Sequence, residues 1–275
     1  MKIIDGKKIR NKILISIKKE VASLPFQPIF CDVLVGNDKA SAQYVQMKKN
    51  RAEEVGIKFH SAKFLAAIKT EDLIKEIKKL NRLPNMCGII VQLPLPQKLN
   101  QNKILNAIDS SLDVDCLGKI ASEKFYGGLT SVCPPAALAC IKLLDFSGVS
   151  LKNKKIVVLG QGKLVGKPVS ALLKFRGLKS VAISSKSKNK KEIIKEADVI
   201  ISGIGKGKFI TGDMIKKGAV LIDAGTSESK GSVVGDIDFE SVKDKAGFIS
   251  PVPGGVGPVT VAMLLNNVLH VAKNK

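Results

Sequence analysis

Short apolar runs and amphipathic stretches alternate along this chain, which is the pattern of an α/β protein. In the first half, the pattern predicts strands over residues 29–35, 57–64 and 88–96. It predicts helices over residues 6–24, 41–55, 71–80 and 99–108, the second of them capped by Ser41. A helix that opens at Cys133, Pro134 and Pro135 and runs through Leu144 leads into the second half.

The second half begins with an apolar run over residues 156–159, followed by a turn that contains Gly160, Gly162 and Gly166. Further strands are expected over residues 180–183, 198–202 and 219–223, and a last helix over residues 261–271. Four evenly spaced β units after one glycine-rich turn predict a doubly wound parallel sheet of the Rossmann type.

The glycine-rich turn has the chemistry of an anion site. Glycines let the backbone turn tightly and approach a ligand, and the free N–H groups of the following helix favour a pyrophosphate. The spacing G-x-G-x-x-x-G is one residue longer than the dinucleotide fingerprint. An ordinary turn that needs positive φ would give the same spacing, so it is the strands that follow that favour a dinucleotide.

The end of the second strand in this half indicates which dinucleotide is bound. An NAD enzyme usually places Asp or Glu about 20 residues beyond the glycines, where it holds the ribose 2′-hydroxyl. Residues 183–188 read Ile-Ser-Ser-Lys-Ser-Lys and contain no acid. Hydroxyl and ammonium groups suit a 2′-phosphate, so NADP is expected and NAD remains possible. A solvated lysine loop is the alternative interpretation.

Composition argues against several other classes of protein. The 275 residues carry a formal net charge of +21, which raises the possibility of a nucleic-acid binder. Only four of the 45 basic residues are arginines, however, and aromatic residues make up 4% of the chain. Base readout favours arginine and single-strand binding favours aromatic platforms, so no nucleic-acid partner is expected.

Membrane, secreted and metal-dependent classes are also disfavoured. The apolar runs are too short to span a bilayer, and the first residues lack the pattern of a signal peptide, which predicts a cytoplasmic protein without a membrane partner. Five scattered cysteines without a C-x-x-C pair, together with two histidines, support neither a disulfide framework nor a zinc site. No metal is therefore expected.

Several polar residues of the first half are candidates for chemistry. Tyr44 and Lys48 share one face of the expected helix at i and i+4, as either a surface pair or a catalytic one. Gln92 ends a buried strand, where open α/β sheets place ligands, although a polar residue there can simply cap the strand. Asp113 and Asp115 lie two apart, so only one of them would face a cleft if the segment is extended. The rigid loop over residues 250–260 is a candidate clamp for an anion or a carbonyl.

Several separated motifs together resemble one family, the bifunctional methylenetetrahydrofolate dehydrogenase/cyclohydrolase enzymes. They are SAQYVQMKKN at 41–50, GIIVQLPLP at 88–96, LDVD at 112–115, VVLGQGKLVGKP at 157–168, GDIDF at 235–239 and PVPGGVGP at 251–258. The QLPLP and PGGVGP pieces are highly specific together, and the resemblance extends from Tyr44 to the last helix.

The resemblance implies two α/β domains with a cleft between them. The first, residues 1–138, would be the catalytic, folate-binding domain, and residues 257–275 would return to it. Residues 139–256 would form the NAD(P)-binding Rossmann domain. The implied activities are oxidation of 5,10-methylenetetrahydrofolate to the 5,10-methenyl form with NADP and hydrolysis of that form to 10-formyltetrahydrofolate, in one-carbon metabolism. A homodimer is the family's habit.

The resemblance also implies roles for individual residues. Lys48 would be the general acid/base, Gln92 would hold it, Tyr44 would stack on or orient the substrate, and Asp115 would hydrogen-bond the pterin. The further implied substrate contacts are Val91, Leu93, Pro253, Gly254, Gly255, Val256 and Gly257. The implied cofactor contacts are Gly160, Gln161, Gly162, Ser185 and Thr226.

Four departures from the family pattern accompany the resemblance. Cys116 stands where the family commonly has glycine, Asn50 replaces a second lysine, and residues 132–135 read Val-Cys-Pro-Pro instead of Pro-Cys-Thr-Pro. Gln161 replaces an arginine that often helps to hold the 2′-phosphate, a role that Lys186 or Lys188 could take. A dehydrogenase of another small substrate and a dinucleotide-binding protein without turnover stay open as alternatives.

Overall fold

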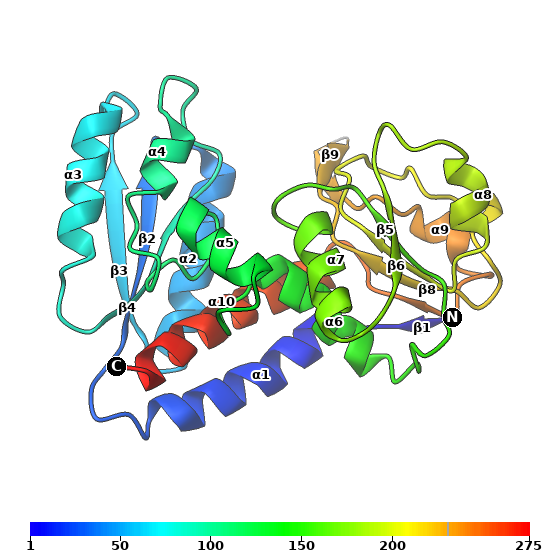
Figure 1. Cartoon of the computed structure of the whole chain (residues 1–275), viewed down its shortest axis with the longest axis horizontal. Helices are drawn as coiled ribbons and strands as arrows, with labels where there is room; N and C mark the ends of the chain where they lie inside the picture. Colours follow the sequence, from blue (N-terminus) through cyan, green and yellow to red (C-terminus); the bar gives the residue numbers. More distant parts are fainter. Residues whose placement is uncertain (230) are drawn as a thin grey trace. The chain divides into compact units, whose positions relative to one another are not determined.

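The computed structural model describes residues 1–229 and 231–275, which form two compact units (Figure 1). Unit 1 comprises Met1–Asn11 and Ala136–Met263, and unit 2 comprises Lys12–Pro135 and Leu264–Lys275. The divisions fall within helix α1 (Gly6–Val21), at the start of α6 (Pro135–Phe146) and within α10 (Val256–Lys273). Across the described residues, no helix is both long and apolar enough to span a bilayer.

Unit 2 is built on a parallel sheet in the order β3-β2-β4. The strands are β2 (Ile29–Val35), β3 (Lys58–Phe64) and β4 (Met86–Val91), and the helices are α2 (Lys39–Glu54), α3 (Thr70–Leu80), α4 (Gln101–Leu105) and α5 (Lys119–Tyr126). One face of the sheet packs Cys31, Val33 and Val35 against apolar residues of α3 and α4. Because side chains alternate along a strand, the residues between them face the other side.

Helix α2 begins two residues before the predicted cap. Asp38 is the N-cap, and its carboxylate accepts a hydrogen bond of 2.7 Å from the backbone N–H of Ser41, so Ser41 lies inside the first turn. Strand β4 ends at Val91, before the two prolines of the predicted strand over residues 88–96. Proline removes the backbone donor that a further ladder bond would need, and Gln92 therefore stands in the loop that follows the strand.

Unit 1 is built on a six-stranded sheet in the order β1-β11-β8-β7-β5-β6, paired in parallel throughout. Its strands are β1 (Lys2–Ile3), β5 (Ile156–Leu159), β6 (Ser180–Ile183), β7 (Val199–Ser202), β8 (Val220–Asp223) and β11 (Phe248–Ile249). The other elements are α7 (Gly166–Phe175), α8 (Lys190–Lys195), the 3-10 turn η1 (Gly212–Met214), α9 (Phe239–Val242) and the antiparallel pair β9 (Ser227–Ser229) and β10 (Ser232–Val234). The predicted Rossmann-type sheet, and with it the α/β fold class, is confirmed.

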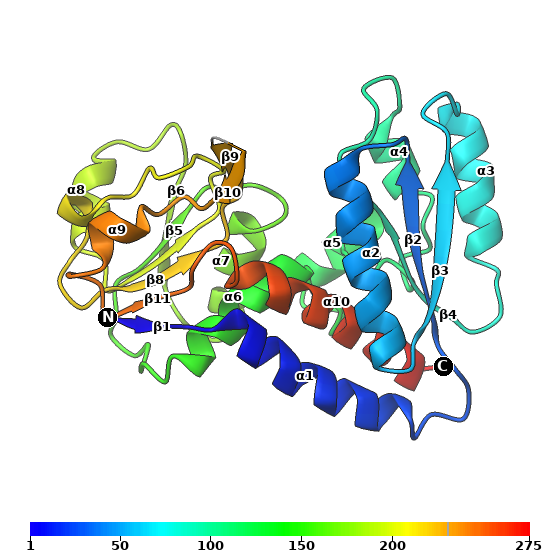
Figure 2. The ribbon, with the colours of Figure 1, turned by 180° about the vertical axis from the view of Figure 1, so that it is seen from behind.

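The first residues of the chain join unit 1, although residues 1–138 are predicted to form the other domain. Strand β1 pairs with β11 at the edge of the sheet, through Lys2 N–H to Gly247 O and Ile4 N–H to Ile249 O, both 2.8 Å (Figure 2). A two-residue strand carries no periodic signal, so the sequence pattern does not reveal it. The last helix also begins earlier than predicted, at Val256 instead of residue 261.

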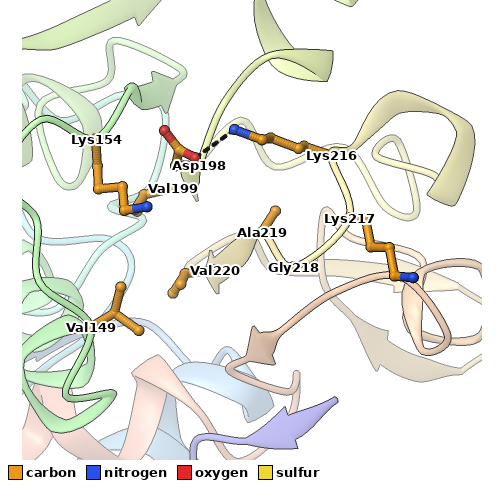
Figure 3. Close-up of a pocket in the computed structure, with 9 residues that line it drawn as sticks. All are labelled: Val149, Lys154, Asp198, Val199, Lys216, Lys217, Gly218, Ala219 and Val220. Atoms are coloured by element: carbon orange, nitrogen blue, oxygen red, sulfur yellow. Dashed lines mark hydrogen bonds and ion pairs between the residues drawn. The ribbon is translucent and has the colours of Figure 1, made fainter.

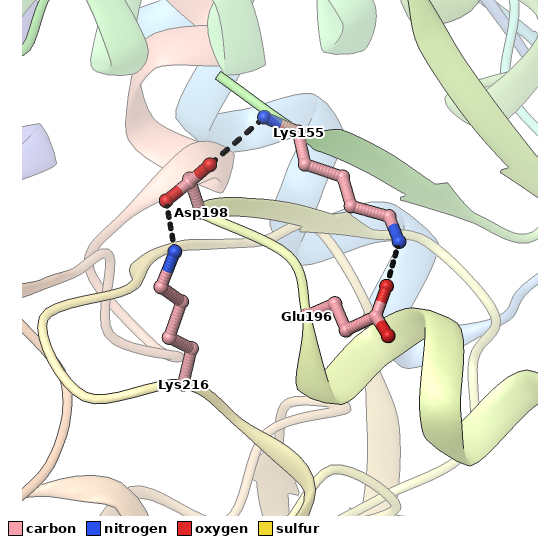
Figure 4. Close-up of polar contacts among 4 residues, drawn as sticks. All are labelled: Lys155, Glu196, Asp198 and Lys216. Carbon is pink, nitrogen blue, oxygen red and sulfur yellow. Dashed lines mark hydrogen bonds and ion pairs between the residues drawn. The ribbon is translucent and has the colours of Figure 1, made fainter.

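Ion pairs fix the amino ends of the unit 1 strands (Figure 4). The carboxylate of Asp198, just before β7, accepts a bond of 2.9 Å from the backbone N–H of Lys155 and one of 2.7 Å from Lys216 Nζ. The side chain of Lys155 pairs with Glu196. These contacts connect β5 and β7 to the loop before β8. They lie at the amino ends of the parallel strands, whereas the glycine-rich turn follows the carboxyl end of β5.

Candidate functional site

Lys48 is a buried amine held at two points inside unit 2. Helix α2 carries it on the face that packs against the sheet, and the residue is 1% exposed. Its Nζ atom lies 2.6 Å from Asp32 Oδ2 and donates a hydrogen bond of 2.7 Å to Gln92 Oε1. An ammonium group has three N–H donors, so these two acceptors leave one donor for another partner.

Gln92 is fixed in turn by its own backbone and side-chain bonds. Its N–H donates to Val33 O at 2.9 Å, and its side-chain amide donates to Leu93 O at 2.7 Å. The amide nitrogen is occupied in this way, so the amide oxygen points at Lys48. Val91 and Leu93 flank it, and Val91 is buried as the last residue of β4.

Tyr44 lies one turn before Lys48 on α2, and the Lys48 ammonium stands 4.9 Å from the centre of its ring. This contact is a cation–π arrangement, which stabilises a positive charge over the ring face. Burial raises the pKa of the Tyr44 phenol, and the nearby carboxyls of Asp115 and Asp32 raise it further. Tyr44 is therefore a neutral phenol near neutral pH.

Asp115 lies in the loop that follows a β bridge between Ile89 and Asp113. Burial raises the pKa of Asp115 to about 7, and the carboxyl of Asp113 raises it further while Lys48 lowers it. The side chain keeps partial contact with solvent. A carboxyl with this pKa can give up or take a proton near neutral pH.

The loop around Asp115 is held by buried polar groups. Asp113 accepts bonds from the N–H groups of Gly118 at 2.7 Å and Asp115 at 3.2 Å. Asn267 of α10, which is 1% exposed, donates to Val114 O at 2.9 Å and to Cys133 O at 2.7 Å. Cys116 takes a left-handed backbone with φ of 56°, so it adopts the conformation that glycine favours.

The glycine-rich turn of unit 1 lies at the carboxyl end of β5 and forms a close-packed cradle. Gly160 has φ of 85°, and a Cβ on Gly166 would lie 1.7 Å from Gly160 O. Helix α7 begins at Gly166 with no side-chain cap, and in its first turn the N–H of Lys167 donates to Gly162 O at 3.2 Å. Gly162 is exposed, and Gln161 donates a bond of 2.8 Å to Gly160 O.

Two further loops, which also follow the carboxyl ends of parallel strands in unit 1, carry the other predicted cofactor residues. After β6, Ser184 and Ser187 close a turn through a bond of 3.0 Å that leaves Ser185 exposed. After β8, Thr226 is exposed at a turn held by two buried acids, Asp223 and Asp236. Asp223 accepts the N–H groups of Gly225, Asp236 and Ile237 at 2.9–3.1 Å.

The segment Pro253–Gly257 forms a turn and the first residues of α10 in unit 1. Gly254 has φ of 110°, and the turn packs against the start of α1, where a Cβ on Gly6 would lie 1.9 Å from Gly255 O. Gly255 and Val256 are buried, while Pro253 and Gly257 are exposed. Their role as substrate contacts stays a prediction.

The structure brings Tyr44, Lys48, Gln92 and Asp115 into one cluster in unit 2 and places the predicted cofactor residues at one sheet edge of unit 1. The sequence reasoning missed Asp32. A lone carboxylate inside the apolar strand Ile-Phe-Cys-Asp-Val-Leu-Val is the signal that could have revealed it.

A cavity of about 260 Å³ lies elsewhere in unit 1, at the amino ends of β7 and β8 (Figure 3). Its lining includes the charged residues Lys154, Lys216, Lys217 and Asp198 and the apolar residues Val199 and Val220. It contains none of the predicted site residues. Within the described ranges, no three His, Cys, Asp or Glu side chains gather in a way that could hold a metal ion.

Comparisons with known proteins cover the whole chain. The model of the tetrahydrofolate dehydrogenase/cyclohydrolase catalytic domain matches residues 4–115, and that of the NAD(P)-binding domain of the same family matches residues 134–275. The bifunctional protein FolD of Nautilia profundicola is 40% identical in an alignment of 278 residues that covers 100% of this chain and 98% of that protein.

Two solved structures are similar along their full length. The bifunctional FolD methylenetetrahydrofolate dehydrogenase/cyclohydrolase of Campylobacter jejuni is 36% identical with a TM-score of 0.95, covering 100% of this chain and 99% of its own. The dehydrogenase-cyclohydrolase of Trypanosoma brucei, in complex with NADP and an inhibitor, is 32% identical with a TM-score of 0.93, covering 99% and 97%. The motif resemblance is confirmed, and the chain belongs to the tetrahydrofolate dehydrogenase/cyclohydrolase family.

Proposed function

We propose that this protein oxidises 5,10-methylenetetrahydrofolate to 5,10-methenyltetrahydrofolate with NADP and hydrolyses the methenyl form to 10-formyltetrahydrofolate. Membership of the family supports both activities and disfavours both a different small substrate and a dinucleotide-binding role without turnover. The observation that carries the proposal to particular side chains is the buried amine of Lys48, held against Gln92 beside the ring of Tyr44.

The residues that follow the carboxyl ends of the unit 1 strands fit NADP. Neither Gly160 nor Gly166 has room for a Cβ, so a pyrophosphate could approach the backbone of this turn closely at the start of α7. Exposed Ser185, Lys186 and Lys188 after β6 suit a 2′-phosphate, and exposed Thr226 supplies a hydroxyl after β8. When bound, NADP supplies the hydride acceptor for the oxidation.

In unit 2, we assign Tyr44 and Asp115 to orienting the folate. The ring of Tyr44 would stack on the substrate, and the Asp115 carboxyl would hydrogen-bond the pterin. Correct orientation matters because alignment of the reacting carbon supplies much of the rate in a hydride transfer. Asp113 and Asn267 support this role because they fix the loop that carries Asp115.

Lys48 would move the protons of the hydrolysis. Water adds to the positively charged methenyl carbon, a C–O bond forms, and a water O–H bond breaks as the Lys48 amine accepts the proton. Lys48 then donates this proton to the ring nitrogen as the C–N bond breaks, and the amine accepts the proton that the hydroxyl group loses as the C=O bond forms. The amide oxygen of Gln92 keeps the amine in place through these transfers.

The proposal is tested with purified protein, methylenetetrahydrofolate and NADP, by the absorbance of reduced nicotinamide and, for hydrolysis, by the loss of the methenyl chromophore. Lys48→Met should abolish both signals. Lys49→Met is the matched control, because Lys49 is the next residue on α2 and its side chain is 43% exposed. If Lys48→Met stayed within about threefold of the wild type, the acid/base assignment would be lost.

We also propose a cytoplasmic homodimer. All five cysteines lie among the described residues and are free thiols, as is usual in a reducing compartment. The dimer rests on the family resemblance alone. Light scattering of the purified protein distinguishes a monomer of 29.4 kDa from a dimer.

A further inference from the structure

Asp32 occupies the centre of β2, the middle strand of the unit 2 sheet. Its neighbours in register are Ser61 on β3 and Ile90 on β4, and its own residue is 0% exposed. It faces α2, since its carboxylate contacts Lys48. Burying a carboxylate in a sheet costs desolvation free energy that an apolar residue of similar size would avoid. Packing alone therefore does not account for an acid at this position.

The contacts of Asp32 are directed at the catalytic amine. Oδ2 lies 2.6 Å from Lys48 Nζ, while Oδ1 accepts no hydrogen bond from the described residues. A carboxylate can accept about four hydrogen bonds, so most of the capacity of Asp32 is unused. A purely structural acid would bind backbone N–H groups, as Asp113 does in the same unit.

The other groups that face this pair carry no full charge near neutral pH. Tyr44 on α2 is a neutral phenol, and Gln92 after β4 is a neutral amide. Asp115 is the other acid close to Lys48, and its pKa is about 7. Cys31, next to Asp32 on β2, has its pKa raised by burial and stays a thiol. Asp32 is therefore the main counter-charge of Lys48.

A pair of this kind can move a proton without creating charge. An ammonium beside a carboxylate and an amine beside a carboxylic acid have the same net charge, and burial favours the neutral form of a carboxylic acid. Burial raises the pKa of Asp32, while Lys48 lowers it. Asp32 is thus able to hold a proton that a solvent-exposed carboxylate would release.

We propose that Asp32 is a positioning residue for the hydrolysis, which fixes the Lys48 nitrogen and takes its proton so that the free amine faces the reacting water. This inference rests on the proposed function. An N–H bond of the ammonium breaks and an O–H bond forms on Asp32. The amine then accepts the proton of the water that adds to the methenyl cation. The pair ends with one proton more than at the start and releases it to solvent, as hydrolysis of a cation requires.

The test compares Asp32→Asn with the wild type in the hydrolysis of the methenyl form. Asp32→Asn should slow hydrolysis about 10- to 100-fold at saturating substrate, with the KM for the methenyl form within about threefold of the wild type. The pH profile of hydrolysis should also change, which a loss of packing alone would not cause. Asp198→Asn, which removes the acid of another lysine pair, is the matched control.

A second measurement does not depend on activity or on a variant of Asp32. The carboxyl carbon of Asp32 is followed by NMR as pH is changed, in the wild type and in Lys48→Met. Its titration should move up by about one pH unit or more when the ammonium is removed. Unchanged hydrolysis and pH profile in Asp32→Asn, or an Asp32 titration indifferent to Lys48→Met, would overturn the inference. A wild type without folate turnover would instead refute the proposed function.

Discussion

The Nζ atom of Lys48 and the Oδ2 atom of Asp32 lie 2.6 Å apart, and their side chains are 2% and 0% exposed. Two buried charges stabilise a fold only weakly as a pair, but each is costly without the other. This relationship links the stability of unit 2 to the residue proposed as its acid/base. We therefore expect that removing one of the two charges lowers stability, and that removing both recovers stability without restoring activity.

Lys48→Met is expected to lower the free energy of unfolding by about 3–5 kcal/mol at pH 8, because it leaves the Asp32 carboxylate buried without a counter-charge. Burial holds the pKa of Asp32 above its unfolded value, so the folded variant binds the proton more tightly and loses stability as pH rises. The loss should be smaller at pH 5. Urea unfolding at the two pH values measures it.

The double variant Lys48→Met/Asp32→Val serves as the control for this prediction. It replaces both charges by apolar groups in a strand that is otherwise apolar, so it should recover most of the lost stability without restoring activity. Equal losses at both pH values, with no recovery in the double variant, would contradict the uncompensated-charge explanation.

Asp115→Asn is expected to flatten the dependence of stability on pH. The folded pKa of Asp115 is about 7, above the ordinary value of 3.8, so between these values the folded state keeps a proton that the unfolded chain has lost. The free energy of unfolding of the wild type therefore falls as pH rises through this window. Asp223, with a pKa of about 7, contributes a similar slope that should remain in the variant.

Unfolding curves at several pH values between 4.5 and 8 test the role of Asp115. Asp72→Asn, which removes an exposed carboxylate on α3, provides the comparison and should leave the slope as in the wild type. A slope in Asp115→Asn that matches the wild type would mean that Asp115 is ionised throughout the window.

Cys116→Gly is expected to change stability by less than about 1 kcal/mol. Glycine removes the cost of a left-handed backbone, about 1–2 kcal/mol. It also loses a buried side chain, whose thiol contacts Val132 O at 3.4 Å, and adds freedom to the unfolded chain. Cys116→Val should be destabilising by about 2 kcal/mol or more, because a β-branched residue is strained at this φ. Thermal unfolding of both variants measures the difference, and a Val variant as stable as the Gly variant would argue against strain at this position.

Periodic patterns predicted the three strands of the unit 2 sheet and the strands β5 to β8 of unit 1, because short apolar runs mark those regions. The short strands β9, β10 and β11 were not predicted. The cluster proposed as catalytic could be predicted only through motifs, since Lys48 and Gln92 are 44 residues apart and periodicity cannot bring them together. The resemblance supplied that link. It also pointed to the residue at Cys116 as unusual, and the positive φ there gives the physical reason.

Features that depend on pairing at a distance escaped the sequence. Strand β1 is two residues long, and only its partner β11 defines it. Asp32 lies in a run that is correctly predicted as a strand, but the identity of its partner comes from the face of α2 that packs on the sheet. In both cases the local signal is weak because the stabilising contact is formed by another segment of the chain.

Lys186→Gln/Lys188→Gln is expected to raise the KM for NADP about tenfold or more while leaving the KM for NAD nearly unchanged. Both lysines are exposed in the loop after β6, which offers hydroxyls and no acid, and Gln161 cannot supply the charge of an arginine. A hydrogen bond to a charged group contributes about 1.5–3 kcal/mol, which sets the expected size. Initial rates of nicotinamide reduction with each dinucleotide measure it, and added salt should weaken NADP binding in the wild type more than in the variant. Lys174→Gln, at the far end of α7, is the matched control for a general loss of positive charge. Equal changes for NADP and NAD would show that these lysines do not contact the 2′-phosphate.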